Sequence, residues 1–199
     1  QNSYNYLTEK FGISTLVTNY ETSTGAVKSD LNYAPLALGG LTKGISTLEM
    51  ASAYAAFPRN GVYTHPYLYT VVTDSNGKVI LSNGDYDVAF DDNKQATITG
   101  QASSKTILSE RTTFYMNSML QNVVTSGTGT SARLSGMTAA GKTGTTTDDY
   151  DRWFVGYTPY YTAAVWTGYD QNEKMRTSGN PAAQLWKKVM SQVHQGLDN

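Results

Sequence analysis

Three adjacent residues could carry chemistry: Lys142, Thr143 and Gly144 combine an ammonium group, a hydroxyl group and a position without a side chain. They fit two motifs. Gly136 through Thr143 matches G-x-x-x-x-G-K-[ST], a loop whose backbone amides cradle nucleotide phosphates. Lys142-Thr143-Gly144 is also the triplet K-T-G, which is found in enzymes that use an active-site serine. The two motifs require different backbones, a helix-opening loop in the first case and a β-strand in the second.

The residues that follow favour the strand. A phosphate-binding loop needs a helix to begin at its Lys-Thr pair, because the helix N-terminus supplies the amides and the dipole that hold phosphate. Here Gly144 and the run Thr145-Thr146-Thr147 follow, and glycine and threonine are poor helix formers. No apolar strand precedes Gly136. We therefore predict a strand over 142–145 and keep a P-loop nucleotide-binding protein as the alternative.

A strand at this place could bind a carboxylate. Alternation along a strand sends Thr143 and Thr145 to the same side. Two hydroxyls and the Lys142 ammonium can then hold a substrate carboxylate through charge-assisted hydrogen bonds. Gly144 would let a ligand backbone approach and pair with the strand, and the Thr145 amide could contribute to an oxyanion hole. The simpler interpretation is an ordinary edge strand with an exposed lysine.

Length and composition indicate one globular domain with a core. The 199 residues are 39% hydrophobic and carry a formal charge of −1, which gives no reason to expect nucleic acid or an anionic membrane as partner. No apolar run approaches the roughly 18 residues of a membrane span. The absence of cysteine excludes thiol catalysis and disulfides. Because His65 and His194 are isolated, we predict no metal and no cofactor.

Hydrophobic periodicity predicts an α+β fold, an antiparallel sheet flanked by helices. Ser46-Thr47-Leu48-Glu49 is a capping box that opens a helix to about residue 57. A second helix follows Ser109, a third begins near Pro181, and a short one ends at Gly12. Hairpins are expected at 67–81 and 153–167, whereas 13–33 and 82–101 read as irregular. In the last helix, either Leu185, Val189 and Val193 or Trp186 and Met190 should face the sheet.

Three further motif matches have ordinary structural explanations. Ser75 to Lys78 fits S-x-x-K but falls in a predicted hairpin turn, whereas a catalytic S-x-x-K needs a helix that brings its lysine to the serine. Ser178 to Asn180 fits S-x-N but adjoins Pro181, where helix capping is expected. Gly127 to Ala132 fits the dinucleotide fingerprint but follows a helix instead of a strand.

Several segments together resemble the transpeptidase domain of class A penicillin-binding proteins, the bifunctional peptidoglycan synthases. Gly141-Lys-Thr-Gly-Thr145 and Gly127-Thr-Gly129 are two of them. The others are Gly40 to Phe57 and the pair Trp153 to Thr158 with Ala164 to Gly168. The resemblance covers most of the chain in the family's order. It implies an incomplete serine β-lactamase/transpeptidase-like domain in which Lys142, Thr143, Gly144 and Thr145 line the substrate cleft.

The chain departs from the family in one respect. In the family the nucleophilic serine with its lysine (S-x-x-K), and then S-x-N, precede the region that this sequence matches. The resemblance therefore implies that residues 1–199 are the C-terminal portion of the domain, without a catalytic nucleophile and inactive alone.

The implied partners are peptidoglycan stem peptides, β-lactams and the missing N-terminal part of the domain. The implied place is the outer face of the cytoplasmic membrane, this segment being soluble and extracytoplasmic. A non-catalytic wall-binding module stays open as a further alternative.

Overall fold

The computed structural model describes residues 1–91, 93 and 95–199. Its helices are α1 (Asn2–Asn5), the π-helical η1 (Tyr6–Lys10), α2 (Tyr33–Leu38), α3 (Thr47–Tyr54), α4 (Glu110–Thr125), the 3-10 turns η2 (Thr130–Ala132) and η3 (Thr147–Asp149), and α5 (Pro181–Val193). Its strands are β1 (Tyr20–Glu21), β2 (Val27–Lys28), β3 (Val62–Thr64), β4 (Val71–Thr73), β5 (Val79–Ser82), β6 (Gly84–Phe90), β7 (Ala96–Ala102), β8 (Ser104–Thr106), β9 (Ala140–Thr145), β10 (Asp151–Tyr157) and β11 (Thr162–Gly168).

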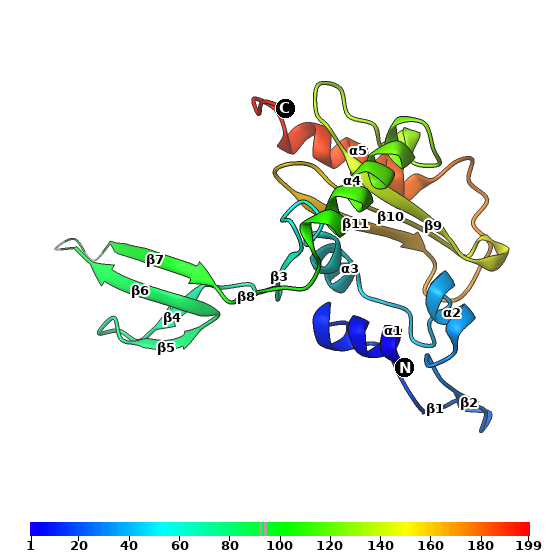
Figure 1. The fold of residues 1–199 in the computed structure, drawn as a ribbon, viewed down its shortest axis with the longest axis horizontal. Helices are drawn as coiled ribbons and strands as arrows, with labels where there is room; N and C mark the ends of the chain where they lie inside the picture. The colour runs from blue at the N-terminus through cyan, green and yellow to red at the C-terminus, as the bar shows by residue number, and fades with distance from the viewer. Residues whose placement is uncertain (92, 94) are drawn as a thin grey trace.

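The centre of the fold is a three-stranded antiparallel sheet in the order β11-β10-β9 (Figure 1). The 153–167 hairpin is confirmed, with Phe154 opposite Val165. On the other side of β10, Phe154 faces Thr143 and Val155 faces Lys142. Because β10 is the middle strand, β9 is an edge strand of this sheet.

Helices cover both faces of the sheet, as the α+β prediction requires. Phe154 and Trp186 are fully buried, and their rings meet edge to face with centroids 5.1 Å apart, which fixes α5 on one face. Tyr157 lies an odd number of residues from Phe154 and so points to the opposite face. There it packs with Leu120 of α4, and its ring lies against that of Phe57, which follows α3; Tyr54, the last residue of α3, packs against the same cluster.

The cap signals in the sequence are confirmed, and one apolar stripe is corrected. Ser46 and Glu49 form the predicted capping box of α3, and Ser109 caps α4. In α5, Trp186 and Met190 are the buried pair. The alternative stripe is wrong, since all three of its members are about half exposed: Leu185, Val189 and Val193.

The prediction of irregular structure over 82–101 is wrong for 84–90 and 96–101, while residues 92 and 94 of that range lie outside the described residues. β6 and β7 pair over seven residues each, from Gly84 opposite Ala102 to Phe90 opposite Ala96. The predicted hairpin at 67–81 is confirmed as the shorter pair β4 and β5. Together the two hairpins form an arm that extends away from the helices, joined to them through the β3–β8 pair (Figure 1).

Residues 13–46 are mostly irregular, with β1, β2 and α2 as short regular pieces. A buried carboxylate, that of Asp30, links two distant parts of this segment through hydrogen bonds. Asp30 is 1% exposed, and its two oxygens accept hydrogen bonds of 2.8 Å from the amides of Val17 and Thr42. Burial alone would raise the pKa of Asp30, but these donors outweigh it and hold the pKa below its usual value.

Candidate functional site

Lys142 lies inside a strand, so the P-loop alternative is wrong. β9 runs from Ala140 to Thr145 and pairs with β10 along its whole length. No helix begins at Lys142, and the nearest helical turn after it is the three-residue η3. The backbone here therefore lacks the helix N-terminus on which phosphate binding by such a loop depends.

The outer edge of β9 presents free backbone groups next to the K-T-G triplet. The amide of Thr146 donates to the Asp151 carbonyl at 3.3 Å, so Thr146 points toward β10. Successive residues of a strand direct their amides to opposite sides. Thr143 and Thr145 consequently turn their N–H and C=O groups away from β10. An extended peptide could pair with them.

The side chains of the triplet divide between the faces of the sheet. Thr143 and Thr145 share the face of their partners Phe154 and Arg152, whereas Lys142 lies on the opposite face. The exposed Lys142 ammonium bends around the edge and donates to the Thr143 carbonyl at 2.8 Å. The ammonium and the Thr143 backbone therefore meet at the outer edge of β9.

One further side chain reaches the triplet, and sequence reasoning missed its contact. Thr128 lies in the loop after α4, and its hydroxyl oxygen is 2.7 Å from that of Thr143. In the sequence, Gly127-Thr-Gly129 stands out only through the family resemblance and the match to the dinucleotide fingerprint. The segment follows α4 and runs into η2, so it is not the turn from a strand to a helix that a dinucleotide site requires.

A network of polar side chains lies at the C-terminal end of β9. The Thr146 hydroxyl donates to Asp151 at 2.9 Å, and the Trp166 indole donates to the other oxygen of the same carboxylate at 2.7 Å. Asp149, in the turn between β9 and β10, forms an ion pair of 2.8 Å with Arg152 of β10. The hydrogen bond from Arg152 lowers the pKa of Asp149. This network fixes where β9 ends.

The other candidate motifs have structural roles. The Ser75–Lys78 match occupies the β4–β5 turn, where the Asp74 amide donates to the Lys78 carbonyl. Asn180 of the Ser178–Asn180 match caps α5 by accepting from the Ala183 amide at 3.0 Å. His194 is buried, and its ring bonds Thr158 and the Met190 carbonyl at 2.7 Å each. His65 is exposed and lies against the Pro66 carbonyl.

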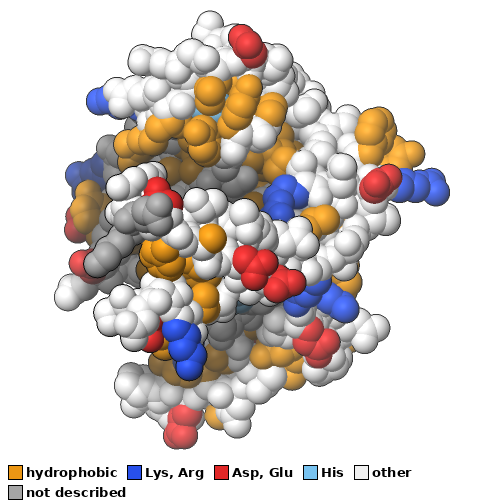
Figure 2. Space-filling model, turned by 90° about the vertical axis from the view of Figure 1, so that its left-hand side faces the viewer, with side chains coloured by type: hydrophobic (Ala, Val, Ile, Leu, Met, Phe, Trp, Pro, Cys, Tyr) orange, Lys and Arg blue, Asp and Glu red, His pale blue; other side chains and the backbone are white. Residues whose placement is uncertain are grey.

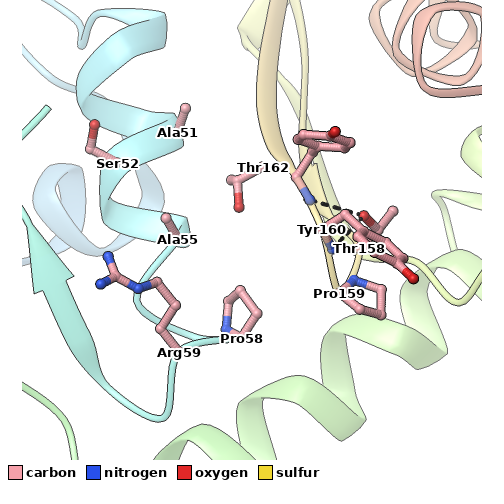
Figure 3. Close-up of a pocket in the computed structure, with 10 residues that line it drawn as sticks. Ala51, Ser52, Ala55, Pro58, Arg59, Thr158, Pro159, Tyr160 and Thr162 are labelled. Carbon is pink, nitrogen blue, oxygen red and sulfur yellow. Dashed lines mark hydrogen bonds between the residues drawn. The ribbon is translucent and has the colours of Figure 1, made fainter. Parts of the chain in front are cut away.

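A cavity of about 390 Å³ lies between α3 and the β10–β11 turn, away from the triplet (Figure 3). Ala51, Ser52 and Ala55 line it from the helix, with Arg59 below them, and Thr158, Tyr160 and Thr162 line the opposite wall. The Tyr160 and Tyr161 amides both donate to the Thr158 hydroxyl. Because none of its lining residues belongs to β9, the cavity is separate from the candidate site.

Positive and negative side chains are mixed on one face of the molecule. Figure 2 shows the face at the arm end of the molecule, where lysine and arginine side chains stand apart from one another with acidic side chains between them. No helix in the described part of the chain is long and apolar enough to cross a bilayer.

An antiparallel sheet packed between helices, with K-T-G on its edge strand, is the arrangement of a penicillin-recognising domain. Comparison with known proteins agrees: the family described as penicillin-binding protein transpeptidase domain matches residues 2–191. The chain belongs to this family.

Its relatives include penicillin-binding protein 1A of Clostridium acetobutylicum, 35% identical over 194 residues, which cover 96% of this chain and 22% of that protein. Penicillin-binding protein 1F of Bacillus subtilis is 37% identical over 79% of this chain and 21% of its own length. The chain thus spans about a fifth of these relatives.

Solved structures show the same fold. The D,D-transpeptidase domain of a peptidoglycan glycosyltransferase from Eggerthella lenta has a TM-score of 0.56 and 27% identity, covering 79% of this chain and 34% of that one. PonA1 from Mycobacterium tuberculosis in complex with penicillin V has a TM-score of 0.68 at 22% identity, covering 98% of this chain and 50% of that one.

Proposed function

We propose that this chain is the C-terminal part of the catalytic domain of a peptidoglycan D,D-transpeptidase and contributes the strand that binds the donor peptide. The observation that carries the proposal is that Lys142-Thr143-Gly144 lies on the free edge of the sheet in a member of this family. The parent enzyme would act on the wall outside the cytoplasm.

In this proposal the stem peptide adds to β9 as a further strand. Its backbone pairs with the outward amides and carbonyls of Thr143 and Thr145, and Gly144 leaves room for the approach. The terminal carboxylate accepts hydrogen bonds from the Thr143 and Thr145 hydroxyls, with the Lys142 ammonium balancing its charge. β-Lactams carry a carboxylate beside their reactive carbonyl and would occupy the same edge.

The chemistry itself requires a serine that an earlier part of the domain would supply. Its oxygen attacks the carbonyl between the two D-alanines, the terminal D-alanine leaves with a proton, and an acyl-serine ester remains. The Thr145 amide is a donor for the oxyanion that forms on the way. An amine from a neighbouring stem peptide then takes the acyl group and frees the serine.

The test is acylation of the full-length protein by a fluorescent penicillin. Charge-assisted hydrogen bonds contribute about 1.5–3 kcal/mol each, so Lys142→Ala should slow acylation by about 10- to 100-fold. Lys187→Ala removes an exposed lysine of α5 and should leave the rate unchanged.

An unchanged rate in Lys142→Ala would contradict the role of this strand. Reversible penicillin binding by the wild-type protein without any covalent label would favour the wall-binding module instead. Labelling of residues 1–199 alone would show that a nucleophile lies within this chain.

A further inference from the structure

We propose that Thr128 is a positioning residue for the carboxylate of the donor substrate, acting through the hydroxyl of Thr143. This inference rests on the proposed function and extends its site to the loop between α4 and η2. The observation that carries it is the 2.7 Å contact between the two hydroxyl oxygens, which joins residues 15 positions apart in the sequence.

The loop is held in place by the end of α4. The Gly127 amide donates to the Asn122 and Val123 carbonyls at 3.0 and 3.1 Å, and the Gly129 amide donates to the Val123 carbonyl at 2.9 Å. Thr128 is therefore fixed on both sides by bonds to the last turn of the helix.

Close packing favours glycine on both sides of Thr128. A Cβ atom on Gly127 would lie 2.9 Å from the Val123 Cα atom, and one on Gly129 would lie 3.1 Å from Val123 and 3.3 Å from the Phe154 ring. Phe154 is the residue opposite Thr143 in the sheet. The loop thus rests on the same part of the sheet that carries the triplet.

The direction of the hydroxyl bond matters for substrate binding. A hydroxyl group donates one hydrogen bond, and a carboxylate only accepts. If Thr143 donated its proton to Thr128, it would have none for the substrate. When Thr128 is the donor, Thr143 accepts and its own proton is free for the carboxylate. Within the described residues, each of these two hydroxyls has the other as its one recorded hydrogen-bond partner.

The experiment compares two ligands on the full-length protein: a penicillin and the same penicillin with its carboxylate converted to a carboxamide. The ratio of their second-order acylation rate constants measures the preference for the carboxylate. Loss of one neutral hydrogen bond corresponds to about a fivefold change. Thr128→Val keeps the shape of the side chain and should reduce the preference by about that factor, because it slows the carboxylate ligand more than the carboxamide ligand.

Two variants complete the design. Thr128→Ser retains the hydroxyl and should keep the wild-type preference. Thr130→Val, which removes a nearby exposed hydroxyl from η2, should also keep it. A Thr128→Val protein that slows both ligands equally, or neither, would overturn the proposal. If the wild-type protein is acylated by neither ligand, the proposed function itself fails, and this inference fails with it.

Discussion

Gly141→Ala should push β9 away from β10 and so disturb both stability and acylation. A Cβ atom at Gly141 would lie 2.6 Å from the Val155 carbonyl oxygen and 2.9 Å from the Gly156 Cα atom. Ordinary contacts of a Cβ atom begin near 3.4 Å, so the first distance falls short by about 0.8 Å. Because both atoms are backbone of the middle strand, no side chain can rotate away to relieve the clash.

The magnitude follows from that shift. Overpacking of this kind costs about 1–3 kcal/mol, and in a domain of this size each kcal/mol lowers Tm by about 2–4 °C. At about 2 kcal/mol, the middle of that range, we expect Tm of the transpeptidase domain to fall by about 4–8 °C. Gly141 adjoins Lys142, and a displacement near 1 Å in a catalytic site costs about 100-fold in rate. Acylation should therefore slow by about 10- to 100-fold.

Thermal unfolding and penicillin acylation of the same preparation measure both effects. Gly40→Ala is the matched control, since a Cβ atom there meets Pro35 at 3.6 Å or more, in ordinary contact. Gly141→Ala with an unchanged Tm would show that β9 and β10 are not packed as closely as described. A lower Tm with normal acylation would refute the link between the strand's position and substrate binding.

Two further predictions concern the scaffold. Asp30→Ala leaves the amides of Val17 and Thr42 without their charged acceptor and should reduce the free energy of unfolding by about 3 kcal/mol at pH 7. Folding lowers the pKa of Asp30. Its contribution to the free energy of unfolding is therefore present above the unfolded pKa near 4 and is lost as the pH falls through the folded pKa. If urea unfolding showed the same advantage of wild type over Asp30→Ala at pH 2 as at pH 7, this reasoning would be contradicted. Trp186→Ala removes a fully buried ring that packs against Phe154 and should reduce the free energy of unfolding by about 3–5 kcal/mol. A reduction below about 1 kcal/mol in urea unfolding would mean that this contact does not fix α5.

Local chemistry made several elements predictable. Ser46 and Glu49 predict the start of α3 correctly because a capping box depends only on residues close in sequence. The strand at Lys142 could be predicted because Gly144 and three threonines oppose a helix. The prediction over 82–101 is wrong although the sequence alternates there: Tyr86 and Val88 alternate with Asp85 and Asp87, and in β6 the first two side chains are half-buried while the aspartates are exposed.

Two features depend on tertiary packing and could not be predicted from local patterns: the buried face of α5 and the contact between Thr128 and Thr143. Trp186 and Leu185 are neighbours on one amphipathic helix, and either stripe could have faced the sheet. Phe154 on β10 meets Trp186 edge to face, and this contact selects the Trp186 stripe. The contact between Thr128 and Thr143 depends on how α4 ends over β9, which no local pattern encodes.

A crystal structure of the full-length protein acylated by a penicillin tests the central claim most directly. The account predicts that the penicillin carboxylate lies within hydrogen-bonding distance of the Thr143 and Thr145 hydroxyls, at the free edge of β9. A carboxylate held elsewhere, with that edge unoccupied in the acylated protein, would contradict it.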